Sequence, residues 1–315
     1  MQVVTDLKQL AGTPAYPVMA IGVFDGVHRG HQQILQTVVA RARESSGTAA
    51  VLSFRPHPQK VIASGQAPLL LQTFAQKAAM FESLGIDVFV QYPFSRELSL
   101  LSPEDFVLQV IHSNGIREIH VGGNFRFGHM RQGDFDTLSE LGTRFGFRVF
   151  KTESVYFRKE RISSTRIRTA LRKGQVALAK RLLGRPYELT GNVVRGAQRG
   201  AGLGFATANL ATNNELIPAN GVYATRVHLN GSSYVGATNI GHRPTVHGYS
   251  EPLPTVETHL LDYSGNLYGQ ALRLEFCFRL RDEKRFSSLE VLKQQIKMDV
   301  HRLRRYARKA LEHEE

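Results

Sequence analysis

The sequence has 315 residues, 42% of them hydrophobic and 21% charged, a composition that is typical of folded globular domains and excludes collagen-like and intrinsically disordered proteins. The length allows two domains, each with its own core. The formal net charge of +13 would suit a nucleic-acid partner, but Lys and Arg are spread along the chain and are dense only at 302–309, so a solvated helix face is favoured there and nucleic-acid binding is not expected.

The N-terminal segment and the single cysteine indicate a cytoplasmic protein. No apolar run is long enough to cross a membrane, and residues 1–6 lack the basic flank and apolar core of a leader. Cys277 cannot form an internal disulfide, and no CxxC or HExxH run offers metal-ligand spacing. We therefore expect no membrane partner, and any metal ion should arrive with a substrate.

The first half of the chain alternates apolar strand patterns with amphipathic helical ones, which indicates an α/β domain with a parallel sheet. Strands are predicted at residues 18–24, 48–54, 88–92, 116–121 and 147–152. Helices are predicted at residues 31–44, 72–84, from 102 onward, 135–145, 164–171 and 176–183.

The pattern changes at Gly184-Arg185-Pro186, where Gly and Pro become frequent and the apolar runs become short and alternating. We place the domain boundary there, between residues 1–184 and 185–315. Strands predicted at 187–194, 221–228, 234–240, 256–261 and 271–278 are typical of a compact antiparallel barrel. From Ser287 onward, apolar residues at helical intervals predict one long helix packed on the barrel.

A glycine-rich run from Gly22 to His31 joins the first predicted strand to its helix. Such a turn presents unpaired backbone N–H groups and the positive end of a helix dipole, which together bind anions. Gly26 and Gly30 allow close approach of a phosphate, and His28 and His31 can direct imidazole donors at one oxyanion. Because no Lys-Ser or Lys-Thr follows, this is not a Walker A loop. The histidines predict attack at the α-phosphate of ATP with loss of pyrophosphate.

A second segment fits the same ATP site. Residues 161–168 place the hydroxyls of Ser163, Ser164 and Thr165 at a helix N-terminus beside Arg161, where they could hold the outgoing phosphates. A plain N-cap explains Ser164 equally well.

The barrel region carries a second candidate ATP site. A glycine-rich flap follows its first strand and can fold over phosphates through the backbone of Gly196, Gly200, Gly202 and Gly204. Thr207 and Asn209 alternate along an extended segment and could hold a magnesium ion bound to nucleotide phosphates, although ordinary turn residues are the alternative. Glu257, in a predicted strand, could accept the proton of an alcohol that is being phosphorylated, unless it is simply an exposed strand residue.

These motifs, with residues 54–58, 121–128 and 162–166, closely resemble the bacterial bifunctional riboflavin kinase and FMN adenylyltransferase family over nearly the whole chain. The resemblance implies a Rossmann-like nucleotidyltransferase domain, then an antiparallel riboflavin kinase barrel with a terminal helix. It implies catalytic roles for His28, His31 and Glu257, and metal ligands in Thr207 and Asn209. Phosphate contacts are implied for Gly22, Phe24, Asp25, Gly26, Gly30, Arg161, Ser163, Ser164 and Thr165, besides the flap glycines. Flavin contacts are implied for Phe54, Pro56, His57, Asn124, Phe125, Arg285 and Phe286.

One position departs from the family pattern. The family has Pro-Thr-Ala-Asn after the flap, whereas this chain has Ala206 before Thr207, so the proline that would fix the backbone there is missing. We expect a slower kinase, with ATP and Mg²⁺ converting riboflavin to FMN and a second ATP converting FMN to FAD. The alternatives are an FAD synthetase whose barrel only binds flavin, and an RNA-associated protein that uses the basic tail. The oligomeric state is not predicted.

Overall fold

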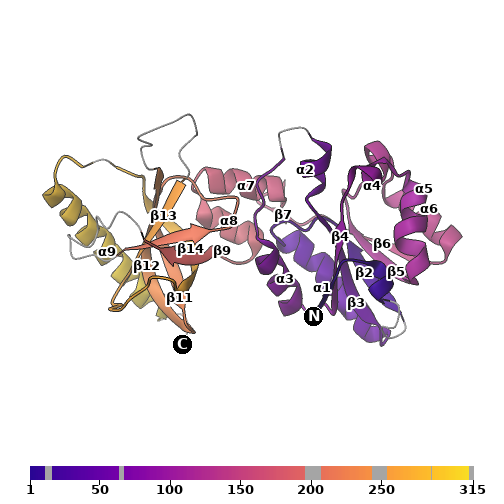
Figure 1. Cartoon of the computed structure of the whole chain (residues 1–315), viewed down its shortest axis with the longest axis horizontal. Helices are drawn as coiled ribbons and strands as arrows, with labels where there is room; N and C mark the ends of the chain where they lie inside the picture. Colours follow the sequence, from indigo (N-terminus) through magenta and orange to yellow (C-terminus); the bar gives the residue numbers. More distant parts are fainter. Residues whose placement is uncertain (11–15, 64–66, 196–206, 243–253, 285, 312–315) are drawn as a thin grey trace. The chain divides into compact units, whose positions relative to one another are not determined.

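The structure is a computed structural model that describes residues 1–10, 16–63, 67–195, 207–242, 254–284 and 286–311 (Figure 1). The chain forms two compact units, Met1–Ser164 and Thr165–Glu315. The division falls before the helices that the sequence analysis placed at the end of the first domain. The functional boundary at residue 184 stays a prediction.

A parallel sheet forms the centre of the first unit. Among the described residues it has six strands, in the order β1-β4-β3-β2-β5-β6. Their bounds are β1 Gln2–Val4, β2 Pro17–Ile21, β3 Thr48–Arg55, β4 Val88–Pro93, β5 Glu118–Gly122 and β6 Arg148–Thr152. The sequence predicted the last five strands but not β1. This strand has only three residues, two of them exposed, so it forms no apolar run. A short antiparallel pair, β7 Tyr156–Phe157 and β8 Glu160–Arg161, was also missed.

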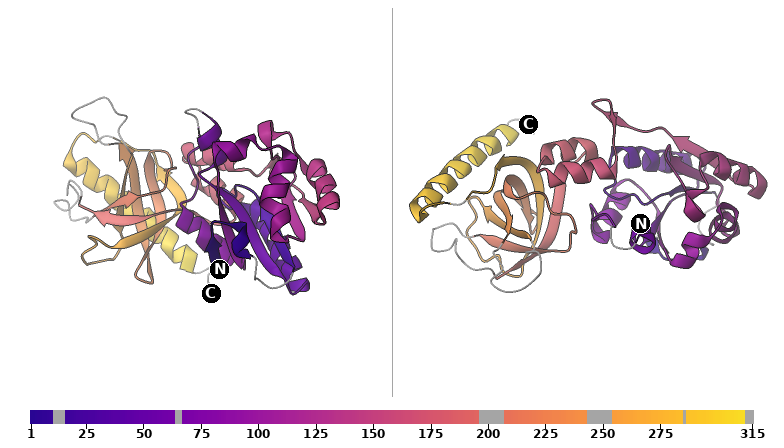
Figure 2. Two further views of the ribbon diagram at one scale, coloured as in Figure 1. Left: turned by 45° about the vertical axis from the view of Figure 1, so that its right-hand side comes forward. Right: turned by 90° about the horizontal axis from the view of Figure 1, so that it is seen from above.

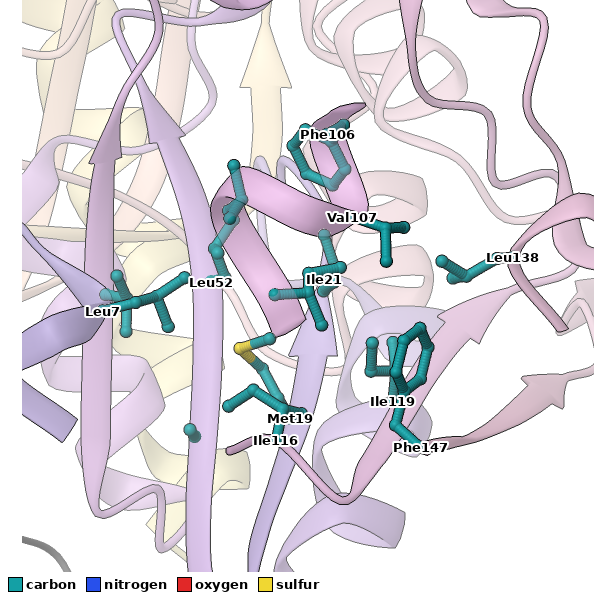
Figure 3. Packing of buried hydrophobic residues seen from close by; sticks show 14 of the residues in the cluster. Leu7, Met19, Ile21, Leu52, Phe106, Val107, Ile116, Ile119, Leu138 and Phe147 are labelled. Carbon is teal, nitrogen blue, oxygen red and sulfur yellow. The ribbon is translucent and has the colours of Figure 1, made fainter. Parts of the chain in front are cut away.

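Helices cover both faces of this sheet because its strands are apolar on both sides. On β2, Val18 and Ala20 face one core with α1 (Arg29–Glu44) and α3 (Phe74–Ser83), whereas Met19 and Ile21 face the other. Figure 3 shows this second core, where strand residues meet Phe106 and Leu138. Its helical side consists of η1 (Leu7–Leu10), α5 (Pro103–Phe106), the π-helical η2 (Val107–Ile111) and α6 (Phe135–Phe145). Shorter helices are α2 (Pro58–Ile62), α4 (Arg96–Leu100), η3 (His112–Asn114) and η4 (His129–Arg131).

The strand order reverses direction at β2. From β2 the chain passes through α1 to β3 on one side, while β5 lies on the other side of β2. Open α/β sheets bind ligands outside the carboxyl ends of the strands at such a switch point. The loops that leave the carboxyl ends of β2 and β5 contain the glycine-rich run and the predicted residue Asn124.

At the amino end of β5, a buried carboxylate joins three segments of the first unit. Glu118 is fully buried and accepts hydrogen bonds from Arg41 of α1 (2.9 Å), from the Tyr16 hydroxyl (3.0 Å) and from Arg148 of β6. Burial alone would raise the pKa of Glu118, but hydrogen bonds from Arg41, Tyr16 and His120 outweigh it and lower the pKa from 4.5 to about 2. Glu118 is therefore ionised and stabilising at neutral pH.

The second unit is a closed antiparallel barrel with the strand order β10-β13-β12-β11-β14-β9 (Figure 2). Its strands are β9 Tyr187–Val194, β10 Ala208–Thr212, β11 Gly221–Leu229, β12 Ser232–His242, β13 Pro254–Leu260 and β14 Ala271–Arg281. The sequence predicted all of these but β10, which it assigned to an extended part of the flap. The barrel fold itself is as predicted.

Two short helices precede the barrel and pack on it. These are α7 (Ser164–Arg172) and α8 (Val176–Leu183). The Leu171 carbonyl accepts a hydrogen bond from the Ala219 amide (3.0 Å), and α8 contacts β9 and β14. These contacts group both helices with the barrel.

The predicted terminal helix is present as α9 (Leu289–Leu311). It lies along the outside of the barrel (Figure 2), where Leu303 is buried and Asp299 accepts a hydrogen bond from Arg281 of β14 (2.9 Å). Among the helices of the described residues, none is both long and apolar enough to cross a bilayer.

We expect Glu118→Gln to destabilise the first unit by on the order of 2 kcal/mol at pH 7. Because the pKa of Glu118 is depressed in the folded state, its contribution is present above pH 4.5 and is lost as pH falls toward about 2. Urea unfolding at pH 7 and pH 3 measures the difference. The control is Glu44→Gln, which breaks an exposed ion pair with the same Arg41 and should cost little. Equal losses at both pH values would contradict the assignment.

Candidate active sites

The turn between β2 and α1 departs from ordinary backbone conformations. Phe24, Gly26 and Val27 have positive φ angles of 50°, 84° and 35°. Only glycine adopts this region freely, and a β-branched residue there is strained by about 1–3 kcal/mol. The strain permits a reversal tight enough for α1 to begin at Arg29, two residues before the predicted start at His31.

Side chains and amides from distant segments hold this turn in place. The Asp25 carboxylate, 3% exposed, accepts the Leu71 amide at 2.9 and 3.2 Å. The Asp25 carbonyl accepts a hydrogen bond from the Ser164 hydroxyl (2.8 Å). Ser164 therefore bonds to the turn and is not a plain N-cap, which was the alternative raised from the sequence.

Two further residues hold the turn at its base, and the sequence analysis did not single them out. Lys77 Nζ of α3 and Ser53 Oγ of β3 both donate to the carbonyl of Val23, each at 2.9 Å. In the sequence, Lys77 is an ordinary lysine of an amphipathic helix and Ser53 is a serine in an apolar strand, and neither pattern predicts this contact.

The two imidazoles lie together at the start of α1. His28 is the N-cap, and its Nδ1 accepts the backbone amide of His31 (3.3 Å). The rings are stacked, with centroids 3.6 Å apart and planes at 17°. Phe24 meets the His31 ring edge-on at 5.2 Å. Because Nδ1 of His28 is an acceptor, the neutral ring carries its proton on Nε2.

The local environment keeps His31 uncharged. Burial, followed by the charges of His28 and Lys77, lowers the pKa of His31 well below its ordinary value of 6.5. Within the described residues, Nδ1 of His31 is buried and has no hydrogen-bond partner. At neutral pH His31 is therefore a neutral imidazole with one N–H to donate.

The glycines of the run leave room for these rings. A Cβ on Gly30 would lie 3.3 Å from Cε1 of His28, and a Cβ on Gly22 would lie 3.1 Å from the Phe24 ring. Room for the rings is thus a second reason for the glycines, besides the close phosphate approach predicted from the sequence.

The predicted phosphate-binding segment runs beside the start of α1. Ile162 donates its amide to the Val155 carbonyl (2.8 Å), and Val155 Cγ2 lies 3.9 Å from the place of a Cβ on Gly30. Arg161 of β8 is exposed and Ser163 is half-buried. Thr165 is exposed and belongs to the second unit.

The predicted flavin residues of the first unit lie at or just after the carboxyl ends of β3 and β5. Phe54 packs edge-on to Phe94 at 5.6 Å, and Phe125 stacks on Phe127 at 5.5 Å, so both contact the apolar core. Asn124 is exposed in the loop after β5. Pro56 is exposed, and His57 caps α2 by accepting the Gln59 amide (3.2 Å).

In the barrel, register aligns three polar residues on adjacent strands. Asn209 of β10 is paired with Glu257 of β13, which is paired in turn with Asn239 of β12. Paired residues share a face, and the neighbours Val256 and Thr258 are buried inside. The half-buried row Asn209–Glu257–Asn239 therefore lies on the outer face. Asn239 was missed because it is an ordinary polar residue of an alternating strand.

Several predicted residues of the second site cannot be placed in the same way. Thr207 is half-buried just before β10, and Phe286 lies under the Arg281 guanidinium at 5.6 Å. Outside the described residues lie Gly196, Gly200, Gly202, Gly204, Ala206 and Arg285.

Known proteins match both halves of the chain. A family model described as FAD synthetase matches residues 12–166, and one described as riboflavin kinase matches residues 183–307. A bifunctional riboflavin kinase/FMN adenylyltransferase from Pseudomonas fluorescens is 40% identical over 301 residues, covering 95% of this chain and 96% of the relative. The chain belongs to the bifunctional riboflavin kinase/FMN adenylyltransferase family.

Other relatives in this family and a solved structure extend over the same length. Proteins of the same name from Escherichia coli K12 and Bacillus subtilis 168 are each 36% identical, covering 95% and 93% of this chain and 96% and 93% of their own. The crystal structure of a protein described as a macrolide-efflux protein from Streptococcus pneumoniae has a TM-score of 0.87 and 28% identity, over 96% of this chain and 98% of that one. The two chains share one fold.

In this family member, we expect Gly30→Ala to displace the imidazoles with little change in stability. The added methyl lies 3.3 Å from the His28 ring, whose cap on α1 then weakens, while alanine favours the helix by up to about 1 kcal/mol. Displacement of the His28 ring should make His31 less buried, so the pKa of His31 should rise toward 6.5. ¹⁵N-histidine NMR can measure this change. Gly122→Ala is the control, because its methyl makes an ordinary 3.4 Å contact with Ile34. An unchanged His31 titration in Gly30→Ala would contradict the steric role.

Proposed function

We propose that this chain uses ATP twice in flavin cofactor synthesis. The barrel phosphorylates riboflavin to FMN, and the first unit transfers an adenylyl group from a second ATP to FMN, giving FAD and pyrophosphate. The observation that supports adenylyl transfer best is the stacked His28–His31 pair at the start of α1, on the switch point of a sheet that matches the FAD synthetase model.

In the adenylyl transfer, an FMN phosphate oxygen attacks the α-phosphorus of ATP. The new P–O bond forms as the bond from the α-phosphorus to the bridging oxygen breaks, and pyrophosphate leaves with that electron pair. Negative charge builds on the α-phosphate oxygens in the transition state. The first amides of α1 and the N–H groups of His28 and His31, which lie together at the start of this helix, are proposed to stabilise this charge.

Other residues near this site divide into ligands and supports. We assign the exposed Arg161 guanidinium to the departing pyrophosphate, because a planar cation pairs well with phosphate. We assign Asp25 and Ser164 to holding the turn, since the carboxylate faces the Leu71 amide and the hydroxyl bonds to the Asp25 carbonyl. A carboxylate would also repel a phosphate. Asn124 and the aromatic residues Phe54 and Phe125 are proposed to contact the flavin.

In the kinase reaction, a riboflavin hydroxyl attacks the γ-phosphorus of ATP. Glu257, on the outer face between Asn209 and Asn239, is proposed to accept the hydroxyl proton. Asn209 and Thr207 offer amide and hydroxyl oxygens, which fit Mg²⁺ shared with nucleotide phosphates. When bound, the ion would offset phosphate charge. A cytoplasmic location stays a prediction.

The comparisons favour two activities over the two alternatives considered from the sequence. The riboflavin kinase model matches the barrel, and the relatives that span the whole chain carry both activities in their names. A barrel that only binds flavin and an RNA-associated protein are therefore not proposed.

Two substitutions should separate the reactions. His28→Ala should lower FAD formation from FMN by about 100-fold or more, because it removes a transition-state donor and the α1 cap, while FMN accumulates. Glu257→Gln should lower FMN formation from riboflavin by about 100-fold and spare FAD formation from supplied FMN. Chromatography of products from riboflavin or FMN with ATP and Mg²⁺ measures both. In each variant the retained reaction reports that the other unit has folded, and urea unfolding reports the stability of the mutated unit. Loss of both reactions in one folded variant would contradict two separate sites.

A further inference from the structure

A short hairpin of the first unit lies beside the start of α1 (Figure 1). It consists of β7 and β8, which pair antiparallel and are joined by a loop of two residues, Arg158 and Lys159. Arg161 of β8 was a predicted phosphate ligand, but the tip of the hairpin has no part in the function proposed so far.

Both ends of this hairpin contact the turn that carries the histidines. Before β7, Val155 Cγ2 lies 3.9 Å from the place of a Cβ on Gly30, the second residue of α1. After β8, the Ile162 amide donates to the Val155 carbonyl (2.8 Å), and the Ser164 hydroxyl donates to the Asp25 carbonyl (2.8 Å). The hairpin is therefore fixed to the proposed phosphate site at both of its ends.

The tip lies within electrostatic reach of that site. It is three residues beyond Val155 and three residues before Ile162. Each residue of a strand advances about 3.3 Å, so the tip lies within roughly 10 Å of the turn. Charges act over about this distance in dilute salt. The tip can therefore act on a triphosphate that extends from the start of α1.

The hairpin carries an excess of exposed cations. Arg158, Lys159 and Arg161 are exposed, and Glu160 is the one acidic residue between β7 and the end of β8. Among the described residues, neither tip cation forms an ion pair with a carboxylate. The Arg158 guanidinium lies over the Phe157 ring instead, 5.5 Å from its centroid. The two tip charges are thus available to an anionic ligand.

The backbone of the tip is unfavourable for the residues that it carries. Arg158 and Lys159 have φ angles of 51° and 63°. A two-residue hairpin loop with positive φ at both positions favours Asn-Gly, because most side chains with a Cβ are strained there. Strain of this kind is concentrated at binding and catalytic sites. Hairpin stability alone does not account for two long cations at these positions.

We propose that the β7–β8 hairpin is a phosphate-binding arm, in which Arg158 and Lys159 join Arg161 in binding the β- and γ-phosphates of ATP and the departing pyrophosphate. The inference rests on the proposed adenylyl transfer. The histidine pair acts on the α-phosphate, whereas the arm offsets the negative charge that the outer phosphates gain as the bond to the α-phosphorus breaks.

Three double substitutions separate the charges of the tip from its backbone. Arg158→Asn/Lys159→Gly removes both charges and supplies the favoured turn. Arg158→Gln/Lys159→Gln removes both charges and keeps the unfavourable turn, and Arg158→Lys/Lys159→Arg keeps both charges. The matched control is Lys8→Gln/Arg117→Gln, which removes two exposed cations from elsewhere in the same unit.

The kinetic readout is FAD formation from supplied FMN. We expect both charge-removing variants to raise KM for ATP about tenfold in about 0.05 M salt, with KM for FMN unchanged. The difference from the wild type should shrink in about 0.5 M salt, because salt screens exposed charges. The charge-keeping variant and the matched control should behave as the wild type. Riboflavin phosphorylation should be unchanged throughout.

Stability gives the opposite ranking, which separates binding from folding. Arg158→Asn/Lys159→Gly relieves the tip backbone, so its urea midpoint should equal or exceed that of the wild type. A variant that is at least as stable as the wild type and yet binds ATP more weakly has lost a ligand contact and not its fold.

Binding of magnesium pyrophosphate, measured by isothermal titration calorimetry, supplies a readout without turnover. Both charge-removing variants should bind it about tenfold more weakly at the first site, while any binding to the barrel is the same in every variant. Wild-type KM for ATP and wild-type pyrophosphate affinity in Arg158→Asn/Lys159→Gly would overturn the proposal. So would an equal loss in the charge-keeping variant, which would make the tip a structural element. If the wild type makes no FAD, the proposed function fails, and the pyrophosphate titrations still decide whether the arm binds phosphates.

Discussion

The carbonyl of Val23 and the carboxylate of Asp25 are the fixed points on which the first site depends. Between them and His28 the backbone passes through left-handed conformations that Phe24 and Val27 do not favour by themselves. Hydrogen bonds from α3, β3, the Leu71 amide and Ser164 hold these two residues. These contacts support the backbone that leads into the stacked imidazoles.

Strand pairing determines where the other residues of both sites lie. In the first unit, the reversal of strand order at β2 brings the loops after β2 and β5 to one edge, while Glu118 ties α1 and β6 together at the opposite edge. In the barrel, register places Glu257 between Asn209 and Asn239 on the outer face. A slip of one residue would turn Glu257 into the buried interior of the barrel.

Local patterns predicted most elements, and long-range contacts explain what they missed. Periodicity identified the strands from β2 to β6 and the helices α1, α3 and α6, and the glycine-rich run indicated the histidine pair. The strand β1 is too short to show a period, and β10 contains only one large apolar residue, Leu210. The roles of Lys77, Ser53 and Leu71 could not be predicted, because hydrogen bonds between groups far apart along the chain produce no local spacing. Asp25 and Ser164 were noticed, but their partners were not.

The helix α7 restricts how this polypeptide can be divided. Its first residue, Ser164, donates to the Asp25 carbonyl, whereas the Leu171 carbonyl near its other end accepts a hydrogen bond from the Ala219 amide, which precedes β11. A fragment that stops before residue 164 loses the hydrogen bond from Ser164 to the histidine turn. A fragment that stops at residue 184 keeps α7 and α8 but loses their contacts with the barrel. Fission of the gene into two independent enzymes would therefore require compensating mutations on at least one side of the cut.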